Sequence, residues 1–593
     1  MADHSMTGAA EDLERPLPSA QGGLWGSDVL AEMLRRLGYA HVALNPGASF
    51  RGLHDSIVNH LGNRDPRMVL CLHENVAVAI AHGWAKVAGT PMAVILHSNV
   101  GLLNGSMALF NAWCDRVPML VLGATGPVDA AARRPWIDWL HTAADQGALV
   151  RSFVKWDNQP ASIPAAVEAM TRADLLTRTA PSGPTYVNFD AALQEAPVET
   201  PPPLPDVTRF RPPAAPAPNA AALDAAVAML RAARAPVILS GRVGRSTADW
   251  ARRVVLAEHL NARVHSDHRA GASFPTDHPL HVGAPATFLG AEAAAAIRAA
   301  DVVLSLDWMD LAGTLRQAGT VAAKVIQVSQ DHHLHHGFGM EHYGLPPADL
   351  HLACEPGVAV AAIADALGAG PGTPPADLPA LAAVPPAPAE APLDVTTLPA
   401  ALGEGLADTP VCLVRVPLGW RGECWHLRHP LDHLGGDGGA GIGSGPGMTI
   451  GAAMALRGSG RLPMAVLGDG DTLMAIQAFW TAAHYRVPLL AVIANNRSFY
   501  NDEVHQERVA KARNRPVENK WIGQRIDDPD IDIVAMARAQ GLTGIGPVRS
   551  AGELVAALRD AVPLVQAGAA VLIDARVAPG YNPAMTAGLT RHP

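Results

Sequence analysis

Two polar positions in the last third of the chain have the residue types and spacing of a magnesium and diphosphate site. The segment GDGDTLMAIQAFWTAAHYRVPLLAVIANNRS spans residues 468–498 and opens on a Gly-Asp-Gly turn around Asp469. Glycines at such a turn let the backbone approach a ligand closely. A helix starting near Asp471 offers free N–H groups to an anion. Asn496 ends the next apolar stretch. A carboxylate, an amide oxygen and diphosphate oxygens form a set that Mg²⁺ accepts.

The alternative is an ordinary strand–turn–helix unit followed by an Asn-containing turn, because Asn favours turns and short motifs often match by chance. The apolar stretches at 464–467 and 489–494 predict strands on both sides of the motif. That complete arrangement favours the ligand-binding interpretation.

The segment resembles the diphosphate- and magnesium-binding motif of thiamin diphosphate (ThDP) enzymes. The resemblance implies that Mg²⁺ is bound by Asp469, Asn496 and the backbone oxygen of Ser498. It also implies that the large residue supporting the cofactor falls on Pro446, with Met448 as a second candidate. The implied cofactor-binding residues are Glu74, Asn104, Ser444, Pro446, Met448, Gly468, Asp469, Gly470, Asp471, Asn496 and Ser498.

A second element, LCLHENVAVAIAHGWAKVAGTP at 70–91, resembles the strand–Glu–helix unit of the same enzymes. The resemblance assigns Glu74 to a hydrogen bond with the aminopyrimidine ring, which favours the imino tautomer that removes the C2 proton of the cofactor. Alone, a Glu at a helix start often only complements the helix dipole. In the family, Glu74 and Asp469 would lie on different subunits, so the resemblance implies a homo-oligomer, at least a dimer and expected to be a tetramer.

Within the acetolactate synthase and 2-oxoacid decarboxylase branch, the details resemble benzoylformate decarboxylase. The segment VILHSNVGLLNG contains His97, a candidate pocket residue, and Asn104. FPTDHP at 274–279 makes His278 a second pocket candidate. A His at a strand end also commonly satisfies a backbone group, which is the alternative for His97.

Three features depart from that pattern, one of them being Pro446 at the place of the large apolar residue that supports the cofactor. Where benzoylformate decarboxylase has Ser after Asn-Pro-Gly, this chain has Ala48 followed by Ser49, so we expect substrate carboxylate recognition to differ. The loop 497–523 is long and charged, and Asp502 falls where pyruvate decarboxylase has an acidic proton donor. Arg497, Asp502, Glu503 and His505 form either a polar pocket or a solvated helix face.

The resemblance therefore predicts ThDP- and Mg²⁺-dependent, non-oxidative decarboxylation of a small 2-oxoacid through a C2 ylide and an enamine, with Glu74, His97, His278 and Asp502 as catalytic candidates. The alternative is a ThDP-dependent carboligase or lyase of the acetolactate synthase or benzaldehyde lyase type. A non-catalytic ThDP fold or a nucleotide-binding Rossmann protein would not need Glu74, Asp469 and Asn496 together.

Two further cofactor signals are weak. SGRVGRS at 240–246 is only a partial echo of a Gly-rich dinucleotide fingerprint, which argues against FAD. A histidine cluster has irregular ligand spacing and is interpreted as a surface loop. Its members are His332, His333, His335, His336 and His342.

The elements that position these residues fall into three blocks, separated by Pro- and Ala-rich connectors at about 196–220 and 368–392. Short apolar stretches alternate with helical patterns in each block, which predicts three α/β domains with doubly wound parallel sheets. We expect a pyrimidine-binding domain at 23–195, a central domain at 221–367 and a diphosphate-binding domain at 393–580.

Composition restricts the partners. The chain has 593 residues, a net charge of −10 and a pI near 6.2, and no basic run that would bind nucleic acid. The sequence contains no run of about 18 apolar residues, so it predicts no membrane span. The five cysteines lack C-x-x-C spacing, and the N-terminal residues lack the apolar stretch of a signal peptide. We therefore expect a cytoplasmic protein.

Overall fold

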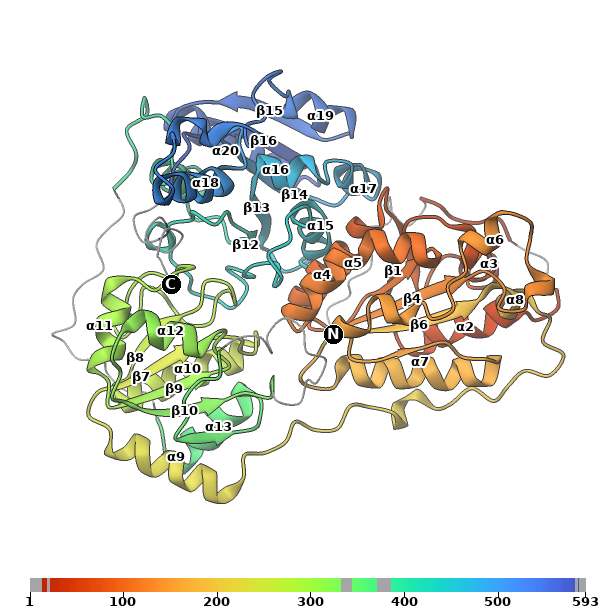
Figure 1. The fold of residues 1–593 in the computed structure, drawn as a ribbon, viewed down its shortest axis with the longest axis horizontal. Coiled ribbons are helices and arrows are strands. Elements are labelled where there is room, and N and C mark those ends of the chain that lie inside the picture. Colours follow the sequence, from red (N-terminus) through yellow and green to blue (C-terminus); the bar gives the residue numbers. More distant parts are fainter. Residues whose placement is uncertain (1–12, 19–21, 332–343, 371–384, 582–584, 586–593) are drawn as a thin grey trace.

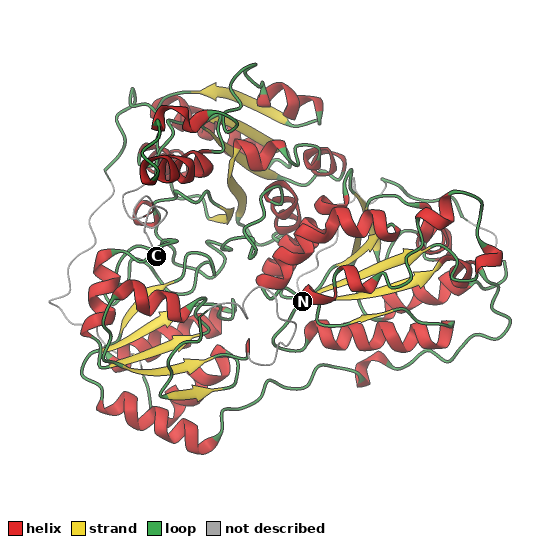
Figure 2. Ribbon diagram, viewed as in Figure 1, coloured by secondary structure: helices red, strands yellow, loops and turns green. Residues whose placement is uncertain are grey.

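The computed structural model contains three parallel β-sheets with helices packed on them. It describes residues 13–18, 22–331, 344–370, 385–581 and 585. Helices cover both faces of the sheets (Figure 2). The expected fold class is confirmed, because all strand pairings within the three sheets are parallel. The exact domain boundaries stay a prediction.

The N-terminal sheet has the strand order β2-β1-β3-β4-β6-β5. Its strands are β1 (His41–Leu44), β2 (Arg67–Leu70), β3 (Ala93–Leu96), β4 (Met119–Thr125), β5 (Asp157–Asn158) and β6 (Pro184–Asp190). Its helices are α2 (Gly26–Arg36), α3 (Arg51–Asp55), α4 (Glu74–Ala88), α5 (Ser98–Cys114), α6 (Ile137–Leu140), α7 (Ile163–Arg178) and α8 (Ala191–Glu195). The central strands are apolar and buried, as expected of a sheet covered on both faces.

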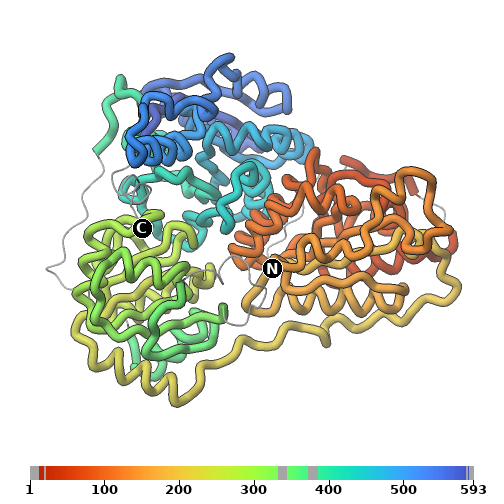
Figure 3. The backbone as a smooth tube through the Cα atoms, in the orientation of Figure 1, coloured from red at the N-terminus to blue at the C-terminus, as the bar shows by residue number. Residues whose placement is uncertain are grey.

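The central sheet has the order β11-β10-β9-β7-β8. Its strands are β7 (Pro236–Ser240), β8 (Arg263–Ser266), β9 (Val302–Leu306), β10 (Lys324–Val328) and β11 (Leu350–Leu352). Its helices are α9 (Ala220–Ala232), α10 (Thr247–Leu260), α11 (Ala291–Ala299), α12 (Leu311–Ala318) and α13 (Pro356–Leu367). The Pro-rich connector before α9 runs along the outside of the N-terminal domain (Figure 3).

The C-terminal sheet has the order β12-β13-β14-β16-β15. Its strands are β12 (Val411–Arg415), β13 (Leu462–Gly468), β14 (Leu489–Asn495), β15 (Thr543–Val548) and β16 (Ala570–Arg576). Its helices are α14 (Thr397–Leu406), α15 (Gly445–Ala455), α16 (Asp469–Leu473), α17 (Ala478–His484), α18 (Tyr500–Ala512), α19 (Ile533–Ala539) and α20 (Ala551–Gln566).

Helices α4 and α15 join the first and last domains through one shared hydrophobic core (Figure 1). Two glycines permit their close approach. A Cβ on Gly83 would lie 2.0 Å from the Met448 carbonyl oxygen, and one on Gly451 would lie 1.8 Å from that of Ile80. Both distances are far inside van der Waals contact, so only glycine fits at these positions. The pairing brings the start of α4, where Glu74 lies, toward the start of α15.

No helix among the described residues is both long and apolar enough to span a bilayer.

Candidate active site

A cavity of about 570 Å³ opens at the carboxyl ends of the C-terminal strands. Segments that follow β12, β13, β14 and β16 all line it, and the central domain adds side chains such as Arg269 and Met309. The carboxyl edge of a parallel sheet is where α/β folds bind ligands, because the loops there converge and helix starts face the opening. Asp469, Asp471, Asn496, Ser498 and Asp502 all lie on this lining.

The three implied magnesium ligands meet at one place in the cavity wall. The backbone N–H of Ser498 donates to Asp469 Oδ2 over 3.2 Å and to Asn496 Oδ1 over 2.9 Å. Asp469 is only 3% exposed, and burial raises the pKa of its carboxyl to about 6, although backbone N–H groups act in the opposite direction.

This donor set fits a hard divalent cation. Asp469 accepts backbone N–H bonds, and it forms no ion pair with a cationic side chain in the described part of the chain. A buried carboxylate beside an amide oxygen and an open cavity offers the oxygen ligands that Mg²⁺ takes. No group of three or more His, Cys, Asp or Glu suited to a metal occurs among the described residues. The histidine cluster at 332–342 lies outside them.

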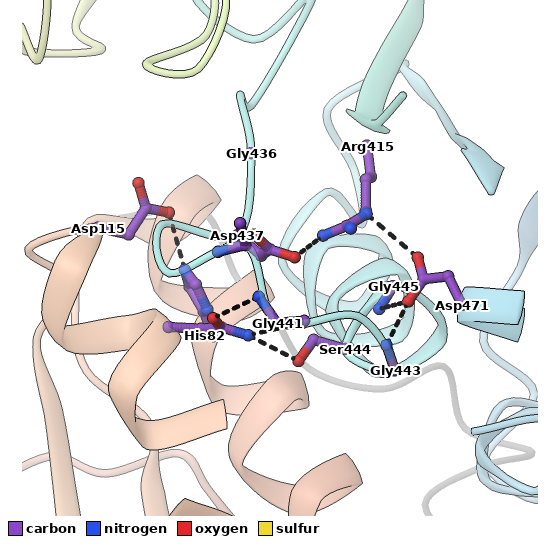
Figure 4. A network of polar contacts seen from close by, with 12 residues as sticks. His82, Asp115, Arg415, Gly436, Asp437, Gly441, Gly443, Ser444, Gly445 and Asp471 are labelled. Carbon is purple, nitrogen blue, oxygen red and sulfur yellow. Dashed lines mark hydrogen bonds and ion pairs between the residues drawn. The ribbon is translucent and has the colours of Figure 1, made fainter. Parts of the chain in front are cut away.

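Asp471 holds the glycine-rich segment 435–447 against the cavity. Its Oδ1 accepts the N–H of Gly443 over 2.6 Å and that of Gly445 over 3.3 Å. Arg415 Nε lies 3.2 Å from Asp471 Oδ2, and the same guanidinium pairs with Asp437 (Figure 4). A segment this rich in glycine has many accessible backbone conformations, so these bonds select one of them.

The N-terminal domain holds the same segment from its other side. Asn111 of α5 donates to the Gly441 carbonyl over 3.0 Å, accepts the Gly441 N–H over 3.2 Å and also donates to Ser444 Oγ. Lys86 of α4 donates to the Gly436 carbonyl over 2.6 Å and pairs with Asp115. Burial opposes ionisation of the Asp115 carboxyl, but Lys86 and His82 hold its pKa below the ordinary value. Asn111, Lys86 and Asp115 were not candidates from the sequence.

Glu74 begins α4 and is buried, with Asn104 of α5 as its partner. The Asn104 side-chain amide donates to Glu74 Oε2 over 3.1 Å. Gly101 makes room for the pair, since a Cβ there would lie 3.2 Å from Glu74 Cγ. The next residue, Asn75, donates to the Gly443 carbonyl over 3.2 Å. The residue after Glu74 therefore contacts the glycine-rich segment that Asp471 also binds.

His97 precedes α5 and is fixed by Ser49, a residue that the sequence marked only as a departure. The Ser49 backbone N–H donates to His97 Nδ1 over 3.3 Å, and Ser49 Oγ lies 2.8 Å from the same nitrogen. Because Nδ1 accepts a bond, the neutral ring carries its proton on Nε2. Burial, together with the nearby His141 ring, lowers the pKa of His97.

Other candidates occupy different surroundings. Asp502 lies on the cavity wall near the start of α18, whereas His278 points to Glu258 of α10, with His278 Nε2 3.2 Å from the carboxylate. Pro446 and Met448 are buried in the first turn of α15, and Met448 packs on α4. Glu74, His97, Asn104 and His278 are not among the described residues that line the cavity.

The fold and site together define an α/β enzyme that holds an anionic cofactor where a Gly-Asp-Gly turn and an Asn-Asn strand end meet. Three family models match in the order that this architecture requires. The N-terminal thiamine pyrophosphate binding domain matches residues 24–149, the central domain 223–337, and the C-terminal thiamine pyrophosphate binding domain 418–575. The chain belongs to the thiamine pyrophosphate (thiamin diphosphate) enzyme family.

Curated relatives agree with this assignment, and solved structures share the fold. Benzoylformate decarboxylase of Pseudomonas aeruginosa is 27% identical over 90% of this chain and 95% of its own length. Sulfoacetaldehyde acetyltransferase of Rhodobacter capsulatus is 30% identical over 50% of this chain and 48% of its own. A thiamine diphosphate-dependent 4-hydroxybenzoylformate decarboxylase of Rhodococcus jostii RHA1 has a TM-score of 0.76 at 23% identity, covering 94% of this chain and 100% of that one.

Proposed function

We propose that the protein catalyses Mg²⁺-dependent, non-oxidative decarboxylation of a small 2-oxoacid of the benzoylformate type. The observation that carries the proposal is the meeting of Asp469, Asn496 and Ser498 on one cavity wall in a chain of this family. Support for the substrate class comes from benzoylformate decarboxylase of P. aeruginosa, which matches along nearly the whole chain.

In this proposal some residues of the chain bind the cofactor and its metal, and others transfer protons. Bound ThDP supplies an electron sink for the carbon beside the substrate carbonyl. Asp469, Asn496 and the Ser498 carbonyl would hold Mg²⁺ and through it the diphosphate. Asn104 orients the Glu74 carboxyl, which in this proposal moves a proton at the aminopyrimidine ring. Residues between 435 and 442 of the glycine-rich segment form part of the cavity wall.

Proton delivery to the product is assigned to His97 and Asp502. The Ser49 contacts occupy His97 Nδ1, so Nε2 is the ring nitrogen left to deliver a proton, and the ring gives it as the imidazolium and is neutral afterwards. Asp502 lies on the cavity wall. The ring of His278 is engaged with Glu258 in the central domain, and the proposal gives it no proton transfer.

A second chain completes the site in this proposal. Glu74 and His97 do not line the cavity of their own chain as described, although α4 packs on α15 of that chain. Beside Asn104, the α5 helix exposes three large apolar side chains, Val100 (40% exposed), Leu103 (56%) and Met107 (40%). Spaced along one helix face, they suit burial against another copy. We therefore propose a homo-oligomer, at least dimeric, with tetramer as the expected state.

The alternative is a carboligase, in which the same site joins the activated fragment to a second carbonyl compound. Two acyl-joining relatives support it over part of the chain. Besides the acetyltransferase of R. capsulatus, acetolactate synthase of Bacillus subtilis is 26% identical over 37% of this chain.

We also propose that the protein resides in a reducing compartment, expected to be the cytoplasm. All five cysteines are free and four of them are buried. Free thiols in this number suit a compartment that keeps them reduced.

The experiment is to load the full-length protein with ThDP and Mg²⁺ and to measure CO₂ release from benzoylformate and from pyruvate separately. Release of CO₂ from benzoylformate with stoichiometric benzaldehyde supports the decarboxylase. Release from pyruvate with acetolactate as product supports the carboligase. If neither 2-oxoacid loses CO₂ while thiamin is recovered from the denatured protein, the decarboxylase proposal is wrong and the cofactor assignment stands.

A further inference from the structure

The segment after Asn496 enters α18, whose mixed charges left its role open. The structure gives the two neighbouring acidic side chains of its first turn different surroundings. Asp502 is exposed and lines the cavity, whereas Glu503 is only 2% exposed. A carboxylate buried to that degree is costly unless hydrogen-bond donors satisfy it. The question is therefore which groups Glu503 binds.

Glu503 binds the side chain of an expected metal-binding residue. Ser498 Oγ donates to Glu503 Oε1 over 2.6 Å, a short bond to a charged acceptor, and Arg525 Nε donates to the same oxygen over 3.2 Å. The backbone N–H of Ser498 is the donor shared by Asp469 and Asn496. Ser498 thus links the buried Glu503 carboxylate to both side-chain ligands of the proposed Mg²⁺ site.

Segment 524–526 fixes the same loop through its backbone. Phe499 N–H donates to the Gln524 carbonyl over 3.0 Å, and Ile526 N–H donates to the Arg497 carbonyl over 3.0 Å. Arg497 has a φ of 57°, in the left-handed region that residues with a Cβ adopt only when their surroundings impose it. The loop therefore depends on anchors around it, and one of them is the buried Glu503 carboxylate, which binds Ser498 and the exposed Arg525.

We propose that Glu503 is a positioning residue for the Mg²⁺ site, acting through the Ser498 hydroxyl and Arg525 to fix the Ser498 backbone. The inference rests on the proposed function, because it requires Mg²⁺ at Asp469, Asn496 and the Ser498 carbonyl. Glu503 itself is not one of the metal ligands in this assignment. Its loss leaves the ligand set chemically complete but frees the loop that orients it. Residues that orient metal ligands in this way typically change metal affinity about 10- to 100-fold.

The test is a titration of full-length, metal-free protein with Mn²⁺ in the presence of ThDP. Electron paramagnetic resonance measures the free Mn²⁺ at each step of the titration. The variants are E503Q, S498A and the double variant, and S498A keeps the backbone carbonyl. The matched control is E507Q, one helical turn further along α18, where Glu507 pairs with Lys511 and Lys520 near the surface.

We expect E503Q and S498A each to weaken Mn²⁺ binding about ten-fold, since each disrupts the same link. The double variant should have the same Mn²⁺ affinity as whichever single variant binds Mn²⁺ more weakly, because the effects of coupled residues are not additive. E507Q should bind as the wild type does. Near-UV circular dichroism of each metal-free variant checks the fold, and if E503Q does not fold, S498A alone decides.

Wild-type affinity in E503Q and S498A overturns the inference, as does strict additivity in the double variant. Failure of the wild-type protein to bind Mn²⁺ with ThDP is a different result, because it overturns the proposed Mg²⁺ site itself.

Discussion

The side-chain amide of Asn104 donates a hydrogen bond to Glu74 Oε2 over 3.1 Å, joining the first turn of α4 to the second turn of α5. Both helices start at the carboxyl edge of the N-terminal sheet, after β2 and β3, which are both neighbours of β1. The bond fixes one carboxylate oxygen of Glu74, and Gly101 packs beside the other.

This relationship predicts separable effects of two substitutions. E74Q should lower turnover by about 10²- to 10⁴-fold, the usual contribution of an acid–base group, while ThDP stays bound. N104L should lower turnover less, by about ten-fold, because Glu74 loses one hydrogen bond but keeps its carboxyl. Turnover and thiamin content of the denatured protein are measured together. Full activity in E74Q contradicts the assignment of Glu74.

Ser49 is predicted to act through the His97 tautomer. S49A removes the hydroxyl that lies 2.8 Å from His97 Nδ1 and should lower kcat about ten-fold, whereas S49T should restore most of it. The pH profile of kcat should move in S49A, because the hydroxyl contacts the titrating ring. A changed KM with unchanged kcat and pH profile would instead indicate that Ser49 only binds substrate.

A hybrid oligomer tests which chain supplies each half of the site. E74Q and D469N should each be inactive alone. If the halves come from different subunits, co-expression of the two variants with different affinity tags should restore about a quarter of wild-type activity, as random mixing in a two-fold dimer implies. If the doubly tagged hybrid stays inactive, each chain completes its own site.

Loss of Asp471 is predicted to destabilise the protein strongly. D471A removes the oxygen that accepts the N–H groups of both Gly443 and Gly445, and it leaves the largely buried Arg415 with Asp437 as its one ion-pair partner among the described residues. Breaking a buried ion pair by removing one partner costs about 3–5 kcal/mol. Urea unfolding measures the change. D530N is the control, since Asp530 is 54% exposed in its pair with Arg576 and should change stability by about 1 kcal/mol or less.

A buried histidine in the central domain, His281, is predicted to lower the free energy of unfolding in acid. Burial, with the neighbouring His265 ring, lowers the pKa of His281 to about 3, against 6.5 for an unperturbed His. Below pH 6.5 the unfolded chain binds a proton that the folded one does not, so stability falls with pH between 6.5 and about 3. The slope is about 1.4 kcal/mol per pH unit from this residue.

Urea unfolding at pH 7, 6 and 5 measures that slope. H281Q should reduce it, whereas substitution of the exposed His60 by Gln should leave it unchanged. Equal slopes in H281Q and the wild type would show that His281 is not responsible.

The sequence by itself determined the three parallel-sheet domains and the enzyme family, and it proposed the residues that would carry the cofactor chemistry. Apolar strands followed by Gly-Asp-Gly, by Asn-Asn or by His-Glu are local patterns, and the carboxyl ends of parallel strands share one edge, so Asp469 and Asn496 had to lie close together. The helix expected after Glu74 does begin there, whereas the helix expected near Asp471 begins at Asp469.

Only the tertiary structure decided which polar groups support those residues. Ser49 and His97 are far apart in the chain and meet because they follow the paired strands β1 and β3. Lys86 and Gly436, and likewise Asn111 and Gly441, meet because α4 and α5 pack against the glycine-rich segment. Glu503 and Asp502 are adjacent and chemically alike, yet one is buried and the other exposed. Burial and partner choice depend on packing between distant segments, which no local pattern of residue types specifies.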